Sequence, residues 1–254
     1  MIAPDTTYFF MHVMKTGGTT LVQQIQANFP SSAIFPPSGR TLERRRGYFL
    51  VDELRRIDPE RRRSIRIYTG HFPFVASEIV GADVTLAVLR DPIDRTLSYL
   101  RHCKRYRPHM ADMSLEQIYD DRWAYVTRIH NYQAKLFGMT IDDEPRSDLQ
   151  VIEVDARRLE TALANLERLD VLGLHERYPE FIETLRREHG WKMRDVPNMR
   201  VSTEEWEVPP HLPERIAADN AADMAFYDRA RELYDQRRNA GMSSRHPSGT
   251  FNRA

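Results

Sequence analysis

Short apolar runs alternate with amphipathic stretches along this chain, and this alternation constrains its fold more than any other feature. A short apolar run bounded by turn residues is typical of a buried strand, and strands that alternate with helices form a mainly parallel sheet. The pattern therefore predicts an α/β domain with a helix-rich C-terminal half. The expected strands are Tyr8–Met14, Ile65–Thr69, Val84–Leu89, Leu149–Val154 and Val171–Leu174.

Helices are expected between these strands and after them. The best-specified start is at Pro92, because proline suits the first helical position and Asp91 before it is a good N-cap. We expect this helix to run to about Lys104. The other expected helices are Thr19–Ala27, Ser114–Asp120, Trp123–Phe137, Tyr178–His189 and Pro213–Arg238, and a long proline-bearing connection is expected over Met193–Leu212.

Charge and cysteine content limit the partners and the compartment. Among 254 residues, 37 Lys and Arg balance 37 Asp and Glu, so no global field attracts nucleic acid. Cys103 is the single cysteine, which excludes an intrachain disulfide and favours a reducing compartment. The apolar run Tyr8–Met14 is far shorter than a transmembrane span, and no basic segment of a signal peptide precedes it. We expect a cytoplasmic protein without a transmembrane anchor.

The length suits one domain, which we expect to cover residues 1–240. Residues 241–254 are rich in Gly, Ser and Arg and are expected to form a mobile tail. The oligomeric state is left open by the sequence.

The first chemical motif is the turn between the first strand and the first helix. Such a turn directs backbone N–H groups and the positive end of a helix dipole at one point, where a phosphate or sulfate fits. The alternative is an ordinary βα turn in which the glycines serve backbone geometry only. A nucleotide-kinase loop is disfavoured, because here the lysine precedes the glycine pair. The residues of the motif are Lys15, Thr16, Gly17, Gly18, Thr19 and Thr20.

The second motif, Arg90-Asp91-Pro92, follows the strand Val84–Leu89. Ser98 lies seven residues after the cap and therefore on the same helical face, close to the strand end that carries Arg90. Arg90 and Ser98 can then hold one phosphate together. The alternative is that Arg90 pairs with a neighbouring carboxylate and Ser98 is an ordinary helix serine.

Together the two motifs resemble those of the PAPS-dependent sulfotransferases, most closely the glycan-type branch that includes the uronyl and heparan sulfate 2-O-sulfotransferases. The resemblance implies a P-loop-like three-layer αβα domain. It also implies that Lys15 to Thr20 hold the 5′-phosphosulfate of 3′-phosphoadenosine-5′-phosphosulfate (PAPS), and that Arg90 and Ser98 hold its 3′-phosphate. Arg200, in the proline-bearing connection, would reach the 3′-phosphate or the adenine.

The resemblance continues along the chain. Tyr68-Thr69-Gly70-His71-Phe72 is similar to the family's strand-end Gly-His segment, which implies that His71 is the catalytic base and that Lys15 stabilises the leaving oxygen. A histidine satisfied at a strand end is the alternative for His71. The segment 129–138 resembles the family's Asn-x-Gln helix, and 171–177 its Val-Gly-x-x-Glu stretch. His12 is expected inside the first strand.

The expected activity is transfer of the sulfuryl group of PAPS to a hydroxyl of a carbohydrate, glycolipid or small molecule, with adenosine 3′,5′-bisphosphate (PAP) as product. No metal is expected, because the other histidines show no ligand spacing. A P-loop-like kinase or NTPase and a non-catalytic nucleotide-binding protein are the alternatives. The arginine runs 44–46, 55–56 and 61–63 could line an entrance for an acidic glycan, but the interleaved carboxylates favour a solvated helix face.

Overall fold

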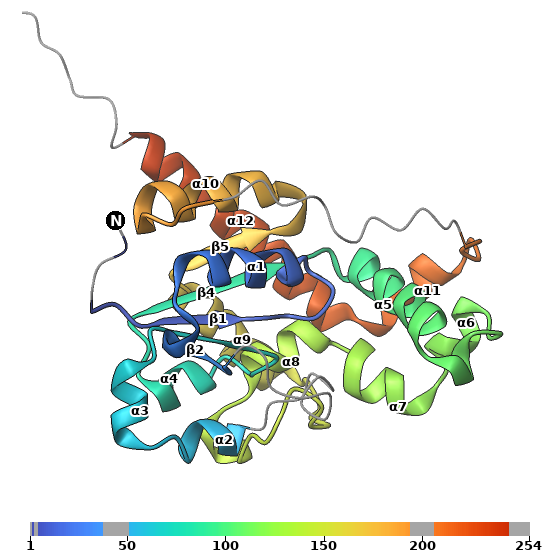
Figure 1. Ribbon diagram of the computed structural model, residues 1–254. Coiled ribbons are helices and arrows are strands. Elements are labelled where there is room, and N and C mark those ends of the chain that lie inside the picture. The colour runs from blue at the N-terminus through green and yellow to red at the C-terminus, as the bar shows by residue number, and fades with distance from the viewer. Residues whose placement is uncertain (1, 3–4, 38–50, 194–205, 244–254) are drawn as a thin grey trace, which may run out of the picture.

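The computed structural model describes residue 2 and residues 5–37, 51–193 and 206–243 (Figure 1). In this part of the chain, five parallel strands form one sheet with the order β2-β3-β1-β4-β5. The strands are β1 (Tyr8–Met11), β2 (Ile34–Phe35), β3 (Ile67–Gly70), β4 (Val84–Leu89) and β5 (Val171–Leu174).

Helices cover both faces of the sheet, so the predicted three-layer α/β fold is confirmed (Figure 1). Alternate residues of each strand point to opposite faces, as in Phe9 and Phe10 of β1, which are both fully buried in different apolar clusters. Phe10 packs on the face covered by α1 (Gly18–Asn28) and α10 (Tyr178–His189). Phe9 packs on the face covered by α2 (Val51–Arg55), α4 (Ala76–Val80), α8 (Tyr132–Gly138), α9 (Ala156–Arg168) and α12 (Ala221–Ser243).

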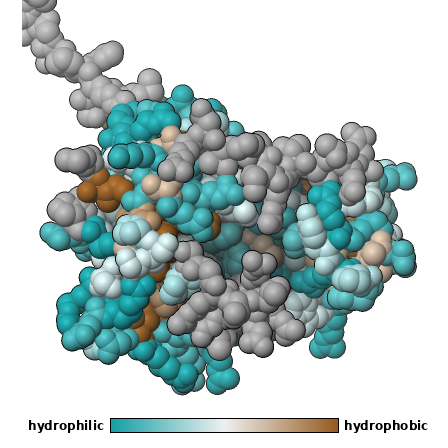
Figure 2. Space-filling view, viewed as in Figure 1, coloured by the Kyte–Doolittle hydropathy of each residue, from teal (hydrophilic) through white to brown (hydrophobic). Residues whose placement is uncertain are grey.

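A third apolar cluster lies beside the sheet rather than on it. It is built from α5 (Pro92–Tyr106), α6 (Leu115–Tyr119), α7 (Arg122–Ala124) and α11 (Leu212–Asp219), which group together at one side of the molecule (Figure 1). The part of the surface that is coloured by hydropathy in this view is mostly hydrophilic (Figure 2). The remaining helix, α3 (Pro59–Ser64), precedes β3.

Several predicted boundaries are confirmed because local signals set them. The carboxylate of Asp91 accepts hydrogen bonds from the N–H groups of Ile93 and Asp94 at 2.9 and 3.0 Å, which makes it the N-cap of α5. Ser114 caps α6 in a capping box with Gln117. The bounds of β4, β5 and α10 coincide with those expected.

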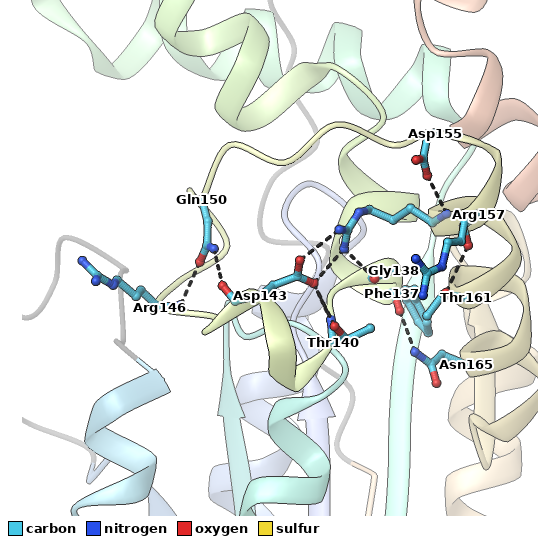
Figure 3. Close-up of polar contacts among 11 residues, drawn as sticks. Phe137, Gly138, Thr140, Asp143, Arg146, Gln150, Asp155, Arg157, Thr161 and Asn165 are labelled. Atoms are coloured by element: carbon cyan, nitrogen blue, oxygen red, sulfur yellow. Dashed lines mark hydrogen bonds and ion pairs between the residues drawn. The ribbon is translucent and has the colours of Figure 1, made fainter.

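The predicted strand Leu149–Val154 is wrong: this segment is an irregular connection between α8 and α9. The side chain of Gln150 fixes the backbone just before this segment, since its amide accepts from Arg146 N and donates to Asp143 O at 2.9 Å each (Figure 3). Val151 is 63% exposed, so the apolar run is not buried as a strand would be. Apolar residues alone could not distinguish this surface connection from a strand.

The two longest predicted helices are each interrupted. The expected helix Trp123–Phe137 consists of α7, a π-helical turn over Tyr125–Ile129 and α8, with a break at Asn131, whose φ is 46°. The expected helix Pro213–Arg238 is divided into α11 and α12 at Asn220. The two breaks face each other, because Asn131 N donates to Asn220 Oδ1 at 2.8 Å.

The remaining differences are small. The first strand ends at Met11 rather than Met14, β3 covers Ile67–Gly70 rather than 65–69, and the short strand β2 was not expected.

Within the described ranges no helix is long and apolar enough to cross a membrane. Most of the proline-bearing connection (194–205) and most of the expected tail (244–254) lie outside the described residues, whereas 241–243 belong to α12.

Candidate anion-binding site at the carboxyl edge of the sheet

The candidate site lies where β1 and β4 end side by side. The two strands are parallel neighbours with Met11 opposite Ala87, so the segments that follow them leave from the same edge. After β1 the chain continues to β2 and β3 on one side of the sheet, and after β4 it continues towards β5 on the other. Ligands of open parallel sheets bind at this kind of topological switch point.

The turn after β1 contains two left-handed residues directly before a helix. Lys15 and Gly17 adopt left-handed conformations, with φ of 70° and 91°, and α1 begins directly after them at Gly18. The buried Thr16 hydroxyl donates to Val13 O at 2.9 Å, so this side chain closes the loop on itself. Thr19 and Thr20 are half-buried in the first turn of α1. The start of α1, with the positive end of its dipole, therefore faces the switch point.

His12 covers the start of α1, although it was expected to be only a strand residue. A Cβ atom at Gly18 would lie 2.1 Å from Cδ2 and 2.3 Å from Nε2 of His12, so the imidazole occupies the space of a side chain at position 18. The ring of His12 also stacks on Phe10, with 5.5 Å between the ring centroids. Gly18 is thus required because of a neighbouring side chain, and His12 is a site residue that the sequence analysis missed.

Arg90, the residue after β4, joins the second motif to the first. Its guanidinium Nη1 donates to Lys15 O at 3.4 Å. Arg90 Nε is buried, and among the described residues no hydrogen-bond partner meets it, which leaves a donor for an anion. Burial lowers the pKa of Arg90 from its ordinary value, while Asp94 and Asp91 oppose that shift. The two motifs therefore contact each other.

Ser98 and Arg95 lie about one turn apart on α5 and differ in burial. Ser98 is half-buried, one turn after Asp94, and no contact between it and Arg90 is seen. Arg95 is fully buried and turns away, because its Nη2 donates to Arg128 O at 2.9 Å and its guanidinium lies 4.9 Å from the ring centroid of Tyr132. Of these two residues, only Ser98 is available to a ligand at the switch point.

His71 directly follows β3 and contacts the loop after β1. Its Nδ1 lies 2.6 Å from the backbone oxygen of His12, and its ring centroid lies 4.5 Å from that of His12. Because a carbonyl oxygen only accepts, Nδ1 carries the proton and Nε2 keeps a lone pair. Burial lowers the pKa of His71 from its usual value, Arg128 adds to the shift and Asp148 opposes it. The neutral imidazole is the form that can take up a proton.

A third histidine, His175, lies at the same edge after β5. Its Cδ2 is 3.4 Å from the position of a Cβ atom at Gly17, and Tyr178 approaches the same position at 3.7 Å. Burial lowers the pKa of His175, and the charge of Arg90 lowers it further. His12, His71 and His175 thus each follow a buried strand, a repeated position in the sequence that would have pointed to a common edge of the sheet and that the sequence analysis did not use.

Gln133, in the first turn of α8, fixes the backbone of Arg90. Its Oε1 accepts from Arg90 N at 3.1 Å and its Nε2 donates to Arg90 O at 2.8 Å. The sequence analysis noted the Asn131-Tyr132-Gln133 segment without assigning this contact. The side chain of Gln133 is fully buried.

The other predicted residues lie elsewhere. Arg200 and the arginine run 44–46 fall outside the described residues. Arg62 donates to the backbone oxygens of Leu54 and Ile79, and Arg55 pairs with Asp52 on the surface, so these runs serve the local structure. No group of three or more His, Cys, Asp or Glu side chains in the described ranges is arranged to hold a metal ion, and a metal-free reaction stays a prediction.

Comparison with known proteins does not extend this description. No protein-family model matches the chain, and no curated protein matches it either.

Proposed function

We propose that the protein is a PAPS-dependent O-sulfotransferase. One observation carries the proposal: Arg90 Nη1 lies 3.4 Å from Lys15 O, so the residue that would hold the 3′-phosphate touches the loop that would hold the 5′-phosphosulfate. Both junctions follow neighbouring parallel strands at the topological switch point. A nucleotide with phosphates at its 3′ and 5′ positions matches two adjacent anion sites.

The donor would bind through backbone and side-chain groups of both junctions. The loop of Lys15, Gly17 and Gly18 and the hydroxyls of Thr19 and Thr20 face the 5′-phosphosulfate in this proposal. The start of α1 supports this role, because the helix dipole favours negative charge there. Arg90 and Ser98 bind the 3′-phosphate, and the buried donor Arg90 Nε supports that assignment.

The transfer step is an in-line displacement at sulfur. The acceptor hydroxyl oxygen forms a bond to sulfur while the bond between sulfur and the bridging oxygen of the 5′-phosphate breaks. The hydroxyl proton passes to Nε2 of His71, whose Nδ1–H is held by His12 O. Lys15 stabilises the negative charge that develops on the bridging oxygen. The products are the sulfated acceptor and PAP.

A thermal-shift panel tests donor binding directly. A ligand at about 100 times its dissociation constant stabilises the protein by about 2.7 kcal/mol. We expect PAP without magnesium to raise the melting temperature and Mg-ATP to leave it nearly unchanged. Stabilisation by Mg-ATP alone would favour the P-loop-like kinase or NTPase instead.

Turnover needs a separate experiment, because binding does not distinguish an enzyme from a nucleotide-binding protein. The protein is incubated with PAPS that carries labelled sulfate and with carbohydrate, glycolipid and small-alcohol acceptors. Labelled product on one acceptor class supports the enzyme and identifies the acceptor. Binding of PAP without transfer to any of the three classes would favour the non-catalytic alternative.

A cytoplasmic location stays a prediction from the single cysteine.

A further inference from the structure

The side chain of Gln133 continues the pairing of β4 beyond the end of the strand. Its amide accepts from Arg90 N at 3.1 Å and donates to Arg90 O at 2.8 Å, so both polar backbone groups of Arg90 are bound by one side chain. Gln133 is fully buried, and it reaches Arg90 from the start of α8. The direction in which the Arg90 side chain leaves the sheet therefore depends on Gln133.

Gln133 is itself held by the first turn of α12. The carboxylate of Asp223 accepts from Gln133 N at 3.2 Å and from Ala134 N at 2.7 Å, which satisfies two N–H groups at the start of α8. Asp223 is fully buried, and its own N–H donates to Asn131 Oδ1 at 3.0 Å. The start of α12 thus fixes the start of α8 through several buried hydrogen bonds.

A chain of contacts now leads from α12 to the site. Asp223 binds the backbone of Gln133, Gln133 binds the backbone of Arg90, and Arg90 reaches Lys15 O. Tyr227, one turn beyond Asp223, donates its hydroxyl proton to Glu176, two residues after β5. The contacts from Gln133 to Arg90 are to the Arg90 backbone, so they orient its guanidinium without occupying it.

We propose that Gln133 and Asp223 are positioning residues for the 3′-phosphate, acting through Arg90. This inference rests on the proposed function, because it takes Arg90 as the residue that binds the 3′-phosphate. It adds that α12 influences nucleotide affinity through Asp223, which lies 90 residues after Gln133 along the chain.

The test measures the dissociation constants of PAP and of adenosine 5′-monophosphate, which lacks the 3′-phosphate. Gln133→Met keeps the volume of the side chain and removes both hydrogen bonds to Arg90. We expect this variant to bind PAP about tenfold more weakly, as the loss of such hydrogen bonds implies. Its affinity for the monophosphate should stay within about twofold of the wild-type value, because that ligand does not need Arg90.

Asn165→Leu is the matched control. Asn165 is also buried and also binds the backbone of α8, donating to Phe137 O at 2.8 Å, but it does so at the far end of the helix (Figure 3). The Asn165→Leu variant should lower the melting temperature as Gln133→Met does, and it should leave the affinity for PAP unchanged. A control that weakens PAP binding equally would reduce Gln133 to a structural residue and overturn the proposal.

A double-mutant cycle separates action through Arg90 from independent action. If Gln133 acts through Arg90, the variant Arg90→Ala/Gln133→Met binds PAP with the affinity of Arg90→Ala alone. If the double variant instead binds PAP more weakly than Arg90→Ala by the same factor that Gln133→Met alone produces, the proposal is overturned. Gln133→Glu and Asp223→Asn are measured in the same way, and one of them replaces Gln133→Met if that variant does not fold. Failure of the wild-type protein to bind PAP would remove the proposed function together with this inference, whereas tight wild-type binding with unchanged variants would remove only the inference.

Discussion

His71 donates its Nδ1 proton to the backbone oxygen of His12 across 2.6 Å, between the ends of two neighbouring parallel strands. This contact fixes the tautomer of His71 and leaves Nε2 as the acceptor. It also connects β3 to the loop that begins at His12. A group suited to remove a proton is thereby held beside a group of backbone donors suited to bind an anion.

We expect the His71→Asn variant to lose turnover by about a hundredfold or more, because the general base is removed. Asparagine keeps an N–H donor for His12 O, so the affinity for PAP should remain near the wild-type value. Steady-state kinetics and calorimetric titration check the two expectations. His189→Asn is the control and should keep full turnover. His189 is half-buried at the end of α10, where it contacts Tyr8 outside the site. Wild-type turnover in His71→Asn would assign the base to another group.

Lys15→Ala should lower turnover by about a hundredfold, by analogy with the removal of an oxyanion donor. Binding of PAP should weaken less than turnover falls, because PAP carries no sulfuryl group and develops no charge on a bridging oxygen. Lys192→Ala, a change at an exposed lysine, should alter neither quantity. Equal losses of turnover and PAP affinity would instead make Lys15 a simple binding residue.

The pH dependence of stability should report the buried histidines. Burial lowers the pKa of both His71 and His175 from 6.5, so the unfolded chain binds protons more readily than the folded protein. Their contribution to stability is complete above about pH 6.5 and is lost as the pH falls through the lowered pKa values. The free energy of unfolding in urea should fall from pH 7.5 to 5.5, and more gently in His71→Asn/His175→Asn. Parallel pH profiles for the two proteins would contradict this expectation.

Gly18→Ala should destabilise the protein by about 1–3 kcal/mol, because the added Cβ atom overlaps the His12 ring. It should also weaken PAP binding, since the displaced ring and the start of α1 belong to the same loop. The second change His12→Ala should restore stability by removing the overlap. Gly18 lies in α1 and has no positive φ, so backbone conformation adds no cost and the overlap with His12 is the expected cause. No recovery in the double variant would show that the overlap is not the cause.

The buried ion pair of Arg128 and Asp148 should be sensitive to the loss of one partner. Their side chains are 1% and 0% exposed, and Tyr132 donates its hydroxyl proton to the same carboxylate at 2.7 Å. Asp148→Leu leaves a buried guanidinium without this carboxylate and should cost about 3–5 kcal/mol in urea unfolding. The double variant Arg128→Met/Asp148→Leu should lose less free energy of unfolding than Asp148→Leu alone, because no unpaired charge stays buried. Glu78→Gln breaks an exposed pair with Arg168 and should change stability by less than about 1 kcal/mol.

The strands β1, β3, β4 and β5 and several helix ends followed from local signals in the sequence, whereas β2 was not expected and the predicted strand Leu149–Val154 is irregular. The apolar runs of β4 and β5 have the predicted bounds, and Asp91 caps α5 as expected. The loop from Lys15 to Thr20 was predicted to bind an anion because of its position between a strand and a helix, and the structure places it there. Such signals act within a few residues, so they can be recognised without knowledge of the rest of the fold.

The sequence by itself determined the alternation of strands and helices, the two junction motifs and the histidine after β3. Only the tertiary structure decided that the helices break at Asn131 and Asn220, that His12 covers Gly18, and that Gln133 holds Arg90. The physical reason is distance along the chain. Asn131 and Asn220 are 89 residues apart, and their hydrogen bond stabilises a backbone conformation that neither segment has a local reason to adopt.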